Sequence, residues 1–530
     1  MAKTRAPGHA WHPTVRRLAL ALTAAAGLLI WPAAGQQRAG RTPKPTVPSG
    51  EAAPASAAAA ATRTRFLEMF GRGYYPGRTG QLVLIPREGD IITRNDPNVP
   101  FMHGTPWPYD VAIPLLFAGP AVKPGDYPGP AVQQDVAPTL AAALGVHMPP
   151  TASGRALPVL RAGFERPRAV LLVVLDGMRR DYFDRYAAEM PTLTALRRRS
   201  AWFGQAQVNA APSNTAVGHS TIATGADPRV HGITGTNIYD RRRRARYELF
   251  DREAPQDLMA LTIADVWQQA SGGRALVIAQ GSMARAATPL GGHGACQVNG
   301  TAPVMASYEQ ETGRWVSNAE CFRLPAYLEG RNAKTLWPAS GEWMGHKIDS
   351  TVNVRYSGLF PPFEADAFTS VIEREPIGAD QVPDLLLLNF KGADFVGHKH
   401  GPSSNELRAT LAEMDRQLAR VLKALEAKVG DNYLLAITAD HGMPEAAPSP
   451  DRHHLAPAII DLLHRKFDPE GKALVTVYEP ENAQLFVDEE RLASLHLTLR
   501  DLASSLQAQP FVFAAFTEDE VRRASGALKR

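Results

Sequence analysis

Short apolar runs alternate along the chain with segments whose apolar residues recur at helical spacing. The β-branched run 169–175 (AVLLVVL) is typical of a buried parallel strand. Comparable apolar runs lie at 81–86, 112–119, 275–280, 385–390 and 433–439. A leucine-rich stripe from about residue 405 to Gly430 predicts an amphipathic core helix. The alternation indicates an α/β fold with a large, mostly parallel central sheet flanked by helices.

The first 62 residues follow a different pattern from the rest. Arg16 and Arg17 precede the apolar stretch 18–31, and small residues follow it, which predicts a secretory signal peptide over 1–35. An uncleaved membrane anchor is the alternative, but the stretch is short for a span. Residues 36–62 are rich in alanine, proline and glycine and predict a flexible tether. We therefore expect a secreted, periplasmic protein with one catalytic domain over 63–530.

Composition limits the partners and the redox chemistry. The chain has 57 Lys and Arg against 53 Asp and Glu, so its net charge of +4 gives no reason to expect a nucleic acid partner. No segment beyond the first apolar stretch predicts a membrane span or a stable membrane partner. Cys296 and Cys321 are the only cysteines, too few for a disulfide scaffold. In an exported protein they could form one disulfide, and two free thiols are the alternative.

Acidic and imidazole side chains follow three of the predicted strands, at the strand end or in the loop after it. An open α/β sheet places its chemistry at the carboxyl ends of its strands. Thr215 stands at the head of a small-residue segment that continues with Gly218 and His219. Carboxylates and imidazoles suit zinc, and two adjacent ions can hold the attacking and leaving oxygens of a phosphoryl transfer. The residues after the strands are Asp176, Asp394, His398, Asp440 and His441.

Several motifs, in order, carry a family resemblance. They are LDGMRRDY, T-x-x-G-H from Thr215, HGITG from His231, DFVGHKHGP and TADHG. In these residues the chain resembles the alkaline phosphatase superfamily, in the branch of phosphate-irrepressible alkaline phosphatases and nucleotide pyrophosphatase/phosphodiesterases. The resemblance covers the chain from residue 63 onward. It implies an alkaline phosphatase-like sandwich, with an inserted crown or cap region at about 281–365.

The resemblance also implies a set of site residues. Two zinc ions are expected, with Thr215 as the nucleophile that forms a phosphothreonine intermediate. One ion would be held by Asp176, Thr215, Asp440 and His441, and the other by Asp394, His398 and His103. In the family the segment like that around His103 (HGTPWPYD) lies near the C-terminus. The chain therefore resembles a circular permutant, in which 63–160 corresponds to the family's C-terminal segment. His453 and His454 are the alternatives to His103 as the histidine that completes the second metal site.

The expected substrate is a small-molecule phosphate ester. Counted from Thr215, the family's phosphate-binding asparagine falls on Thr236, beside Asn237. The Lys-x-Arg pair of the monoesterases falls on Met283 and Arg285, so the arginine is kept and the lysine is lost. We expect Arg285 to bind phosphate. On balance we favour a phosphomonoesterase, with a phosphodiesterase or nucleotide pyrophosphatase as the alternative enzyme. A non-catalytic protein that binds metal and phosphate is the alternative of another class, and the oligomeric state is left open.

Overall fold

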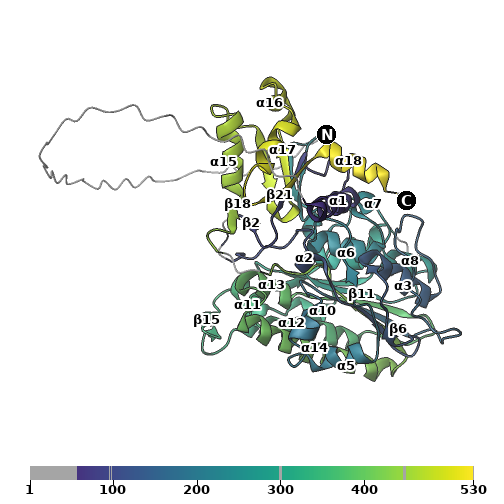
Figure 1. Cartoon of the computed structure of the whole chain (residues 1–530). Helices are drawn as coiled ribbons and strands as arrows, with labels where there is room; N and C mark the ends of the chain where they lie inside the picture. Colours follow the sequence, from purple (N-terminus) through teal and green to yellow (C-terminus); the bar gives the residue numbers. More distant parts are fainter. Residues whose placement is uncertain (1–55, 95, 97, 298–300, 446–448, 529–530) are drawn as a thin grey trace, which may run out of the picture. The chain divides into compact units, whose positions relative to one another are not determined.

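The computed structural model describes residues 56–528, apart from 95, 97, 298–300 and 446–448 (Figure 1). The predicted signal peptide and most of the predicted tether lie outside the described residues. The tether ends earlier than residue 62, because helix α1 (Ala57–Arg72) begins inside it. Its alanine run is the strongest helix former available. Phe66 and Phe70 are buried, and α1 packs along the C-terminal helix α18 (Glu518–Ala527).

A nine-stranded sheet forms the centre of the domain, in the order β13-β12-β11-β16-β6-β17-β3-β7-β4. Its inner part is parallel, running from β12 to β17. β3 pairs antiparallel with β17, so the sheet is mixed at its margins. The parallel strands are β12 (Val304–Glu309), β11 (Val277–Ser282), β16 (Asp384–Phe390), β6 (Ala169–Leu175) and β17 (Tyr433–Thr438). The marginal strands are β13 (Arg314–Val316), β3 (Leu115–Ala118), β7 (Ala201–Trp202) and β4 (Gly125–Asp126).

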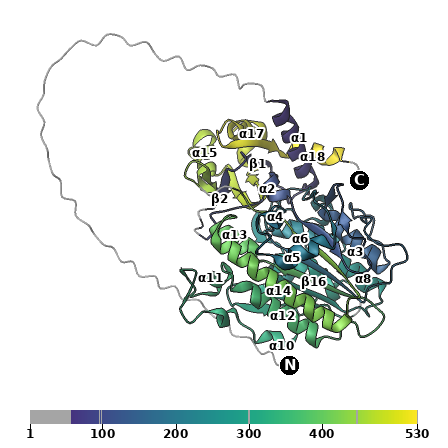
Figure 2. The same ribbon diagram turned by 60° about the horizontal axis from the view of Figure 1, so that its bottom comes forward.

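Helices cover both faces of this sheet, which confirms the predicted α/β fold. Figures 1 and 2 show α5, α12 and α14 on one face and α3, α6 and α8 on the other. These helices are α5 (Pro191–Arg198), α12 (Phe360–Arg374), α14 (Asn405–Val429), α3 (Val136–Leu144), α6 (Thr215–Thr224) and α8 (Ile263–Ala270). Among them α14 follows its predicted pattern closely: Ser404 caps it by accepting from Leu407 N, and it stops before Gly430.

A second, four-stranded sheet has the order β19-β20-β1-β21. Strand β1 (Leu82–Pro86) comes from the N-terminal part of the chain. Its neighbours β20 (Gln484–Val487) and β21 (Val512–Thr517) come from the C-terminal part, as does β19 (Val475–Glu479). Both pairings of β1 are antiparallel, and Leu82 lies opposite Thr517. In the chain, α15 (Ala456–Phe467) precedes β19, and α16 (Glu489–Ser494) and α17 (Leu499–Gln507) lie between β20 and β21.

The segment 281–365, expected to be an inserted cap, contributes to the central sheet through β12 and β13. Beyond them it contains a short hairpin of β14 (Glu342–Trp343) and β15 (His346–Lys347), followed by α11 (Thr351–Arg355). Other short elements are α2 (Pro108–Val111), α4 (Tyr182–Arg185), α7 (Pro228–His231), α9 (Ala284–Gly291), α10 (Ala326–Glu329), α13 (Gly392–His400), β2 (Ile91–Thr93), β5 (Ala131–Val132), β8 (Ala206–Gln207), β9 (Asn237–Asp240), β10 (Ala245–Glu248) and β18 (His453–Leu455).

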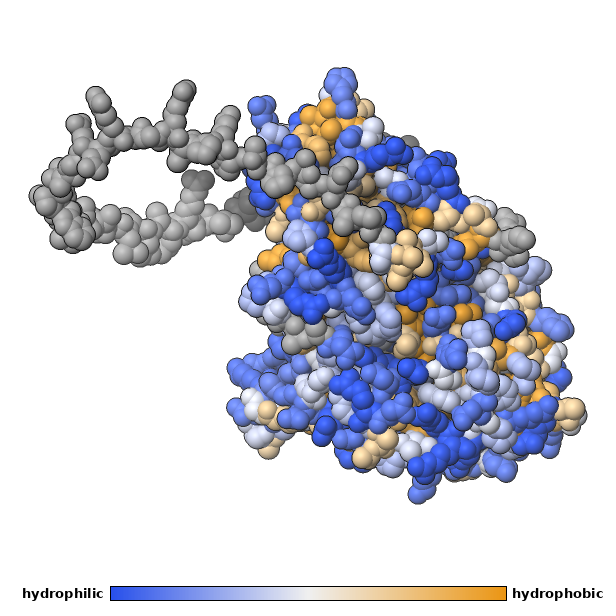
Figure 3. Space-filling view, in the orientation of Figure 1, coloured by the Kyte–Doolittle hydropathy of each residue, from blue (hydrophilic) through white to orange (hydrophobic). Residues whose placement is uncertain are grey.

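In the part of the chain that the structure describes, every helix is too short or too polar to cross a bilayer. The face of the molecule drawn in Figure 3 is mainly hydrophilic, with small scattered apolar patches. Such patches are ordinary on the surface of a globular domain.

Cys296 and Cys321 form a disulfide, with their Cα atoms 4.8 Å apart. They are separated by 25 residues, and closing a loop of that size restricts the unfolded chain. We expect reduction of the native protein to lower its free energy of unfolding by about 3 kcal/mol. Thermal or urea unfolding with and without reductant measures the difference. A Cys296→Ala/Cys321→Ala variant should not respond to reductant. Two thiols open to alkylation in the native, oxidised protein would contradict the expectation.

Candidate active site

The candidate site lies where three neighbouring parallel strands end. Asp176 directly follows β6, Asp440 follows β17, and Asp394 lies in the first turn of α13 after β16. Because β6 pairs in parallel with both other strands, their carboxyl ends meet at one edge of the sheet. All three carboxylates are buried. Gly177 must be glycine, since its φ is +68° and a Cβ would lie 2.9 Å from the Asp394 Cα.

The first group of side chains is formed by Asp176, Asp440 and His441. His441 Nε2 lies 3.5 Å from Asp176 Oδ1 and 3.3 Å from Asp440 Oδ2. The same nitrogen lies 3.3 Å from Thr215 Oγ1. All four side chains are buried. The threonine hydroxyl therefore lies against two carboxylates and an imidazole, side chains that commonly bind metal ions.

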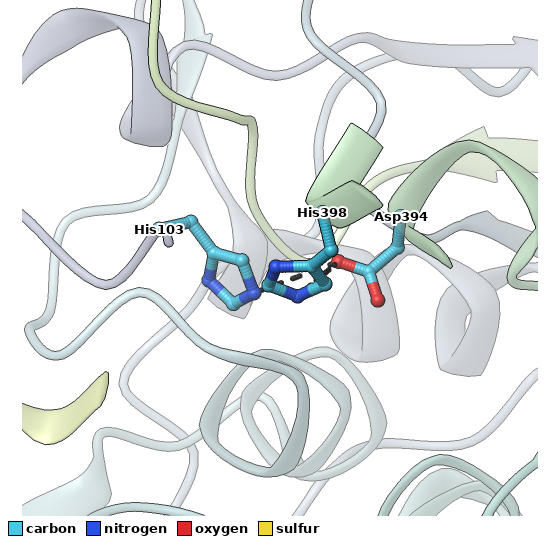
Figure 4. Close-up of side chains that lie close together, drawn as sticks. All are labelled: His103, Asp394 and His398. Atoms are coloured by element: carbon cyan, nitrogen blue, oxygen red, sulfur yellow. Dashed lines mark ion pairs between the residues drawn. The ribbon is translucent and has the colours of Figure 1, made fainter. Parts of the chain in front are cut away.

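The second group is formed by His103, Asp394 and His398 (Figure 4). His103 Nε2 and His398 Nε2 lie 3.5 and 3.3 Å from Asp394 Oδ1. His103 enters from the loop before α2, far from the other two residues in sequence. Its ring stacks on His441 with the centroids 3.6 Å apart, so the two groups are adjacent.

The carboxylates test whether each group suits a metal ion. One oxygen of each carboxylate accepts no well-aligned hydrogen bond from the described residues, although it is buried: Asp176 Oδ1, Asp394 Oδ1 and Asp440 Oδ2, the last 3.2 Å from His219 Nδ1. These are the oxygens that face the histidine nitrogens. A buried anionic oxygen without a partner is costly. A divalent cation between the oxygens and the nitrogens would remove this cost.

The histidines meet the same test. The Nδ1 atom of each ring hydrogen-bonds to a backbone carbonyl, which leaves Nε2 toward the carboxylates. The acceptors for His103, His398 and His441 are the oxygens of Ser213, Phe101 and Gly442, at 2.9, 2.6 and 2.9 Å. Metal-binding histidines are oriented in this way by their second nitrogen. Both groups therefore fit a divalent metal ion.

Thr215 is the first residue of α6. Asn214 caps this helix by accepting from Val217 N at 3.2 Å, and the helix dipole places partial positive charge beside the hydroxyl. Gly218 allows the helix to approach the strand end, because a Cβ there would lie 2.6 Å from Asp440 O. His219 of the same motif instead lies behind the site. Its Nδ1 bonds to the Thr215 carbonyl oxygen at 3.0 Å.

Lys391, between β16 and α13, joins the two groups. Its Nζ lies 2.8 Å from Asp176 Oδ2 and 2.8 Å from Asp394 Oδ2. It also donates to Thr215 Oγ1 at 3.1 Å. The lysine is completely buried. It bonds the outer oxygens of the two carboxylates, so their partnerless oxygens remain directed at the histidines.

The charges of these residues perturb one another strongly. Burial raises the pKa of Asp176 to about 6, and the nearby Asp440 carboxylate adds to the rise. Burial would also raise the pKa of Asp394, but the Lys391 ammonium and the facing histidines outweigh it and hold that pKa well below its usual value. Burial lowers the pKa of His103 well below its usual value and lowers that of His398. Both rings are thus kept neutral, as metal ligands require.

A cleft of about 300 Å³ opens above Thr215. The expected phosphate-binding positions Thr236, Asn237, Met283 and Arg285 all line it. Arg285 Nη1 lies 3.4 Å from Glu248 Oε1. Met283 has a φ of +82°, a backbone conformation uncommon outside glycine.

His453 and His454 lie elsewhere. They belong to β18, which pairs with β2. Their Nε2 atoms contact Thr93 Oγ1 at 2.8 Å and Asp90 Oδ1 at 3.1 Å, respectively. Neither joins the two candidate metal groups.

A comparison with protein families decides the classification. The family model for type I phosphodiesterase / nucleotide pyrophosphatase matches residues 170–522. The chain belongs to this family. The predicted superfamily is confirmed, and with it the prediction of a phosphoric ester hydrolase.

Individual relatives agree with the family. Alkaline phosphatase PafA of Elizabethkingia meningoseptica is 26% identical over 68% of this chain and 77% of that protein. Alkaline phosphatase PhoV of Synechococcus elongatus is 28% identical over 52% of this chain and 59% of that protein. The crystal structure of wild-type PafA matches with a TM-score of 0.52 at 22% identity, over 66% of this chain and 78% of that one. This likeness shows that the two chains share the fold.

Two functional candidates were missed by the sequence reasoning. Lys391 could have been noticed, because it directly follows a buried strand in the motif region that also supplies Asp394. Arg355, at the end of α11, lines the cleft and lies over the Phe395 ring at 4.9 Å. No motif in the sequence identifies it.

Proposed function

We propose that this protein hydrolyses phosphomonoesters through a phosphothreonine intermediate formed on Thr215. One observation carries the proposal: the Thr215 hydroxyl, at a helix N-terminus, contacts His441 of the first metal-ligand group and Lys391, in a cleft that the second group also lines. One zinc ion would be held by Asp176, Thr215, Asp440 and His441. The second would be held by Asp394, His398 and His103.

Hydrolysis takes two steps at this oxygen. The Thr215 oxygen attacks phosphorus and displaces the alcohol, and water then cleaves the phosphothreonine and restores the hydroxyl. Bound zinc would supply the Lewis acid that favours the threonine alkoxide. Lys391 donates a hydrogen bond to the attacking oxygen, and Arg285, which lines the cleft, would bind the non-bridging oxygens.

The charge of the site supports a monoester substrate. A monoester dianion carries more charge on its non-bridging oxygens than a diester, so its transition state needs more cationic donors. Met283 cannot supply the cation that a lysine would bring. Lys391 supplies a cationic donor to the nucleophile while its charge is shared with Asp176 and Asp394, and Arg285 and Arg355 supply further cationic donors in the cleft lining.

A diester substrate is the second candidate. The apolar Met283 leaves room for a second organic group beside the phosphate. The family also includes diesterases, such as venom phosphodiesterase 2 of Crotalus adamanteus, which is 25% identical over 54% of this chain and 28% of that protein.

The ratio of kcat/KM for an aryl phosphate monoester to that for its methyl diester tests the assignment. With zinc present we expect wild type to favour the monoester. Arg285→Ala should lower monoester kcat/KM by about 10²–10³-fold, because a charged donor to the transition state is lost, and should affect the diester less. The exposed Arg243→Ala serves as the matched control. A wild-type preference for the diester that Arg285→Ala leaves unchanged would contradict the proposal.

We propose that the chain order is a circular permutation of the family's order, in a protein exported by its N-terminal signal. The family match begins at residue 170, yet His103 and β1 lie before it. β1 pairs with β20 and β21, both within or near the end of the match. The segment before the family match thus contributes His103 to the second candidate metal group and β1 to the smaller sheet, which supports the permuted order.

The metal content of histidine variants tests this arrangement. His103→Ala should lose one zinc ion per chain and most activity, because the second group keeps only two ligands. His453→Ala and His454→Ala are matched controls and should keep that zinc ion and the activity. Elemental analysis of the zinc-loaded, dialysed proteins gives the count. If His103→Ala kept its zinc while a control variant lost an ion, the permuted order would be wrong at its key residue.

A further inference from the structure

A further cluster of two histidines and one glutamate lies outside the candidate active site. It consists of His346 on β15, His400 at the end of α13 and Glu406 in the first turn of α14. One ligand atom from each lies within 4.8 Å of the others. His346 Nε2 is 2.8 Å from Glu406 Oε1, and the two imidazole rings lie 4.5 Å apart.

We propose that His346, His400 and Glu406 form a third metal site, which takes a zinc ion. Two imidazoles and one carboxylate are a donor set that zinc accepts. All three side chains are partly buried, so a water molecule can complete a tetrahedral shell. The backbone of Tyr356 also interacts with the His400 ring, the kind of contact that orients a metal-binding histidine.

The position of this cluster gives such an ion a role. Its three residues come from three separate elements, one of which is the short β14–β15 hairpin. A bound ion would fasten that hairpin to α13 and α14. α13 also carries Asp394 and His398, and Tyr356 lines the catalytic cleft. The ion would thus stabilise the cleft wall without touching the reacting atoms.

Zinc stoichiometry tests the proposal. Zinc-loaded, dialysed wild type should retain three ions per chain, and His346→Gln should retain two. Glutamine can still donate a hydrogen bond to Glu406, so this variant removes the metal ligand and keeps the hydrogen bond. Glu406→Gln should lose the same ion. His147→Gln, at an exposed histidine outside the cluster, is the matched control and should retain three.

Activity measurements separate this site from the catalytic one. His346→Gln should keep kcat within about twofold of wild type and raise KM for the aryl monoester several-fold, since only the cleft wall loosens. Two ions in wild type, with no change in either cluster variant, would overturn the third site. If the wild-type protein showed no turnover, but His346→Gln still held one zinc ion fewer than wild type, the proposed function would fail and the third metal site would stand.

Discussion

Replacing Thr215 with alanine is expected to lower kcat/KM for an aryl phosphate by on the order of 10⁴-fold or more. Loss of a nucleophile removes the covalent route itself, and single nucleophile knockouts have effects of this size or larger. Thr215→Ser keeps the oxygen and should retain much of the activity. The fold should tolerate the change, because alanine is a good helix former at the start of α6.

Steady-state kinetics with zinc present, together with metal analysis, measure this effect. Thr64→Ala, at an exposed threonine of α1, is the matched control and should match wild type. A quenched wild-type reaction should contain phosphate bound to Thr215, detectable by peptide mass. Turnover by Thr215→Ala within tenfold of wild type would rule out the phosphothreonine route.

Lys391→Met is expected to lower kcat/KM for the monoester by about 10²–10³-fold. The ammonium donates to the attacking oxygen and bonds a carboxylate of each metal group. Removing one charged donor from a buried site costs about 3–4 kcal/mol of transition-state stabilisation. Both catalytic metal ions should remain, because Lys391 bonds the outer oxygens and leaves the histidine-facing ones free.

The matched control is Lys423→Met, at an exposed lysine of α14. Circular dichroism and zinc content show whether the buried change disturbs the fold or the metal groups. A variant that stays folded, keeps both catalytic ions and retains activity within threefold of wild type would refute a catalytic role for Lys391.

Much of the site could be predicted from local sequence. Asp176 and Asp440 follow apolar runs that are buried strands in the structure, so their meeting follows from the parallel sheet. The pairing of His103 with Asp394 could not come from local pattern. It depends on two segments that are far apart in the chain, and only the family resemblance of the HGTPWPYD segment indicated it.

The contact between Lys391 and Asp176 could not be predicted from the local sequence pattern. In the structure Phe390 lies opposite Leu175, so the next residues, Lys391 and Asp176, leave the sheet side by side. That contact depends on strand register, which a single sequence does not display.

The early start of α1 also depends on contacts with distant parts of the chain. Its alanine-rich first turn has the composition of a tether, and the helix is stabilised by the burial of Phe66 and Phe70 in the core.

The place of β1 in the smaller sheet has a consequence for synthesis. A ribosome makes β1 long before its two partner strands, β20 and β21. Until then its backbone donors and acceptors have no sheet partner, and its apolar side chains have no core to enter. Contacts between such distant segments slow folding and expose surface that can aggregate. The nascent chain therefore remains partly unfolded until β20 and β21 emerge, a state that a chaperone can bind.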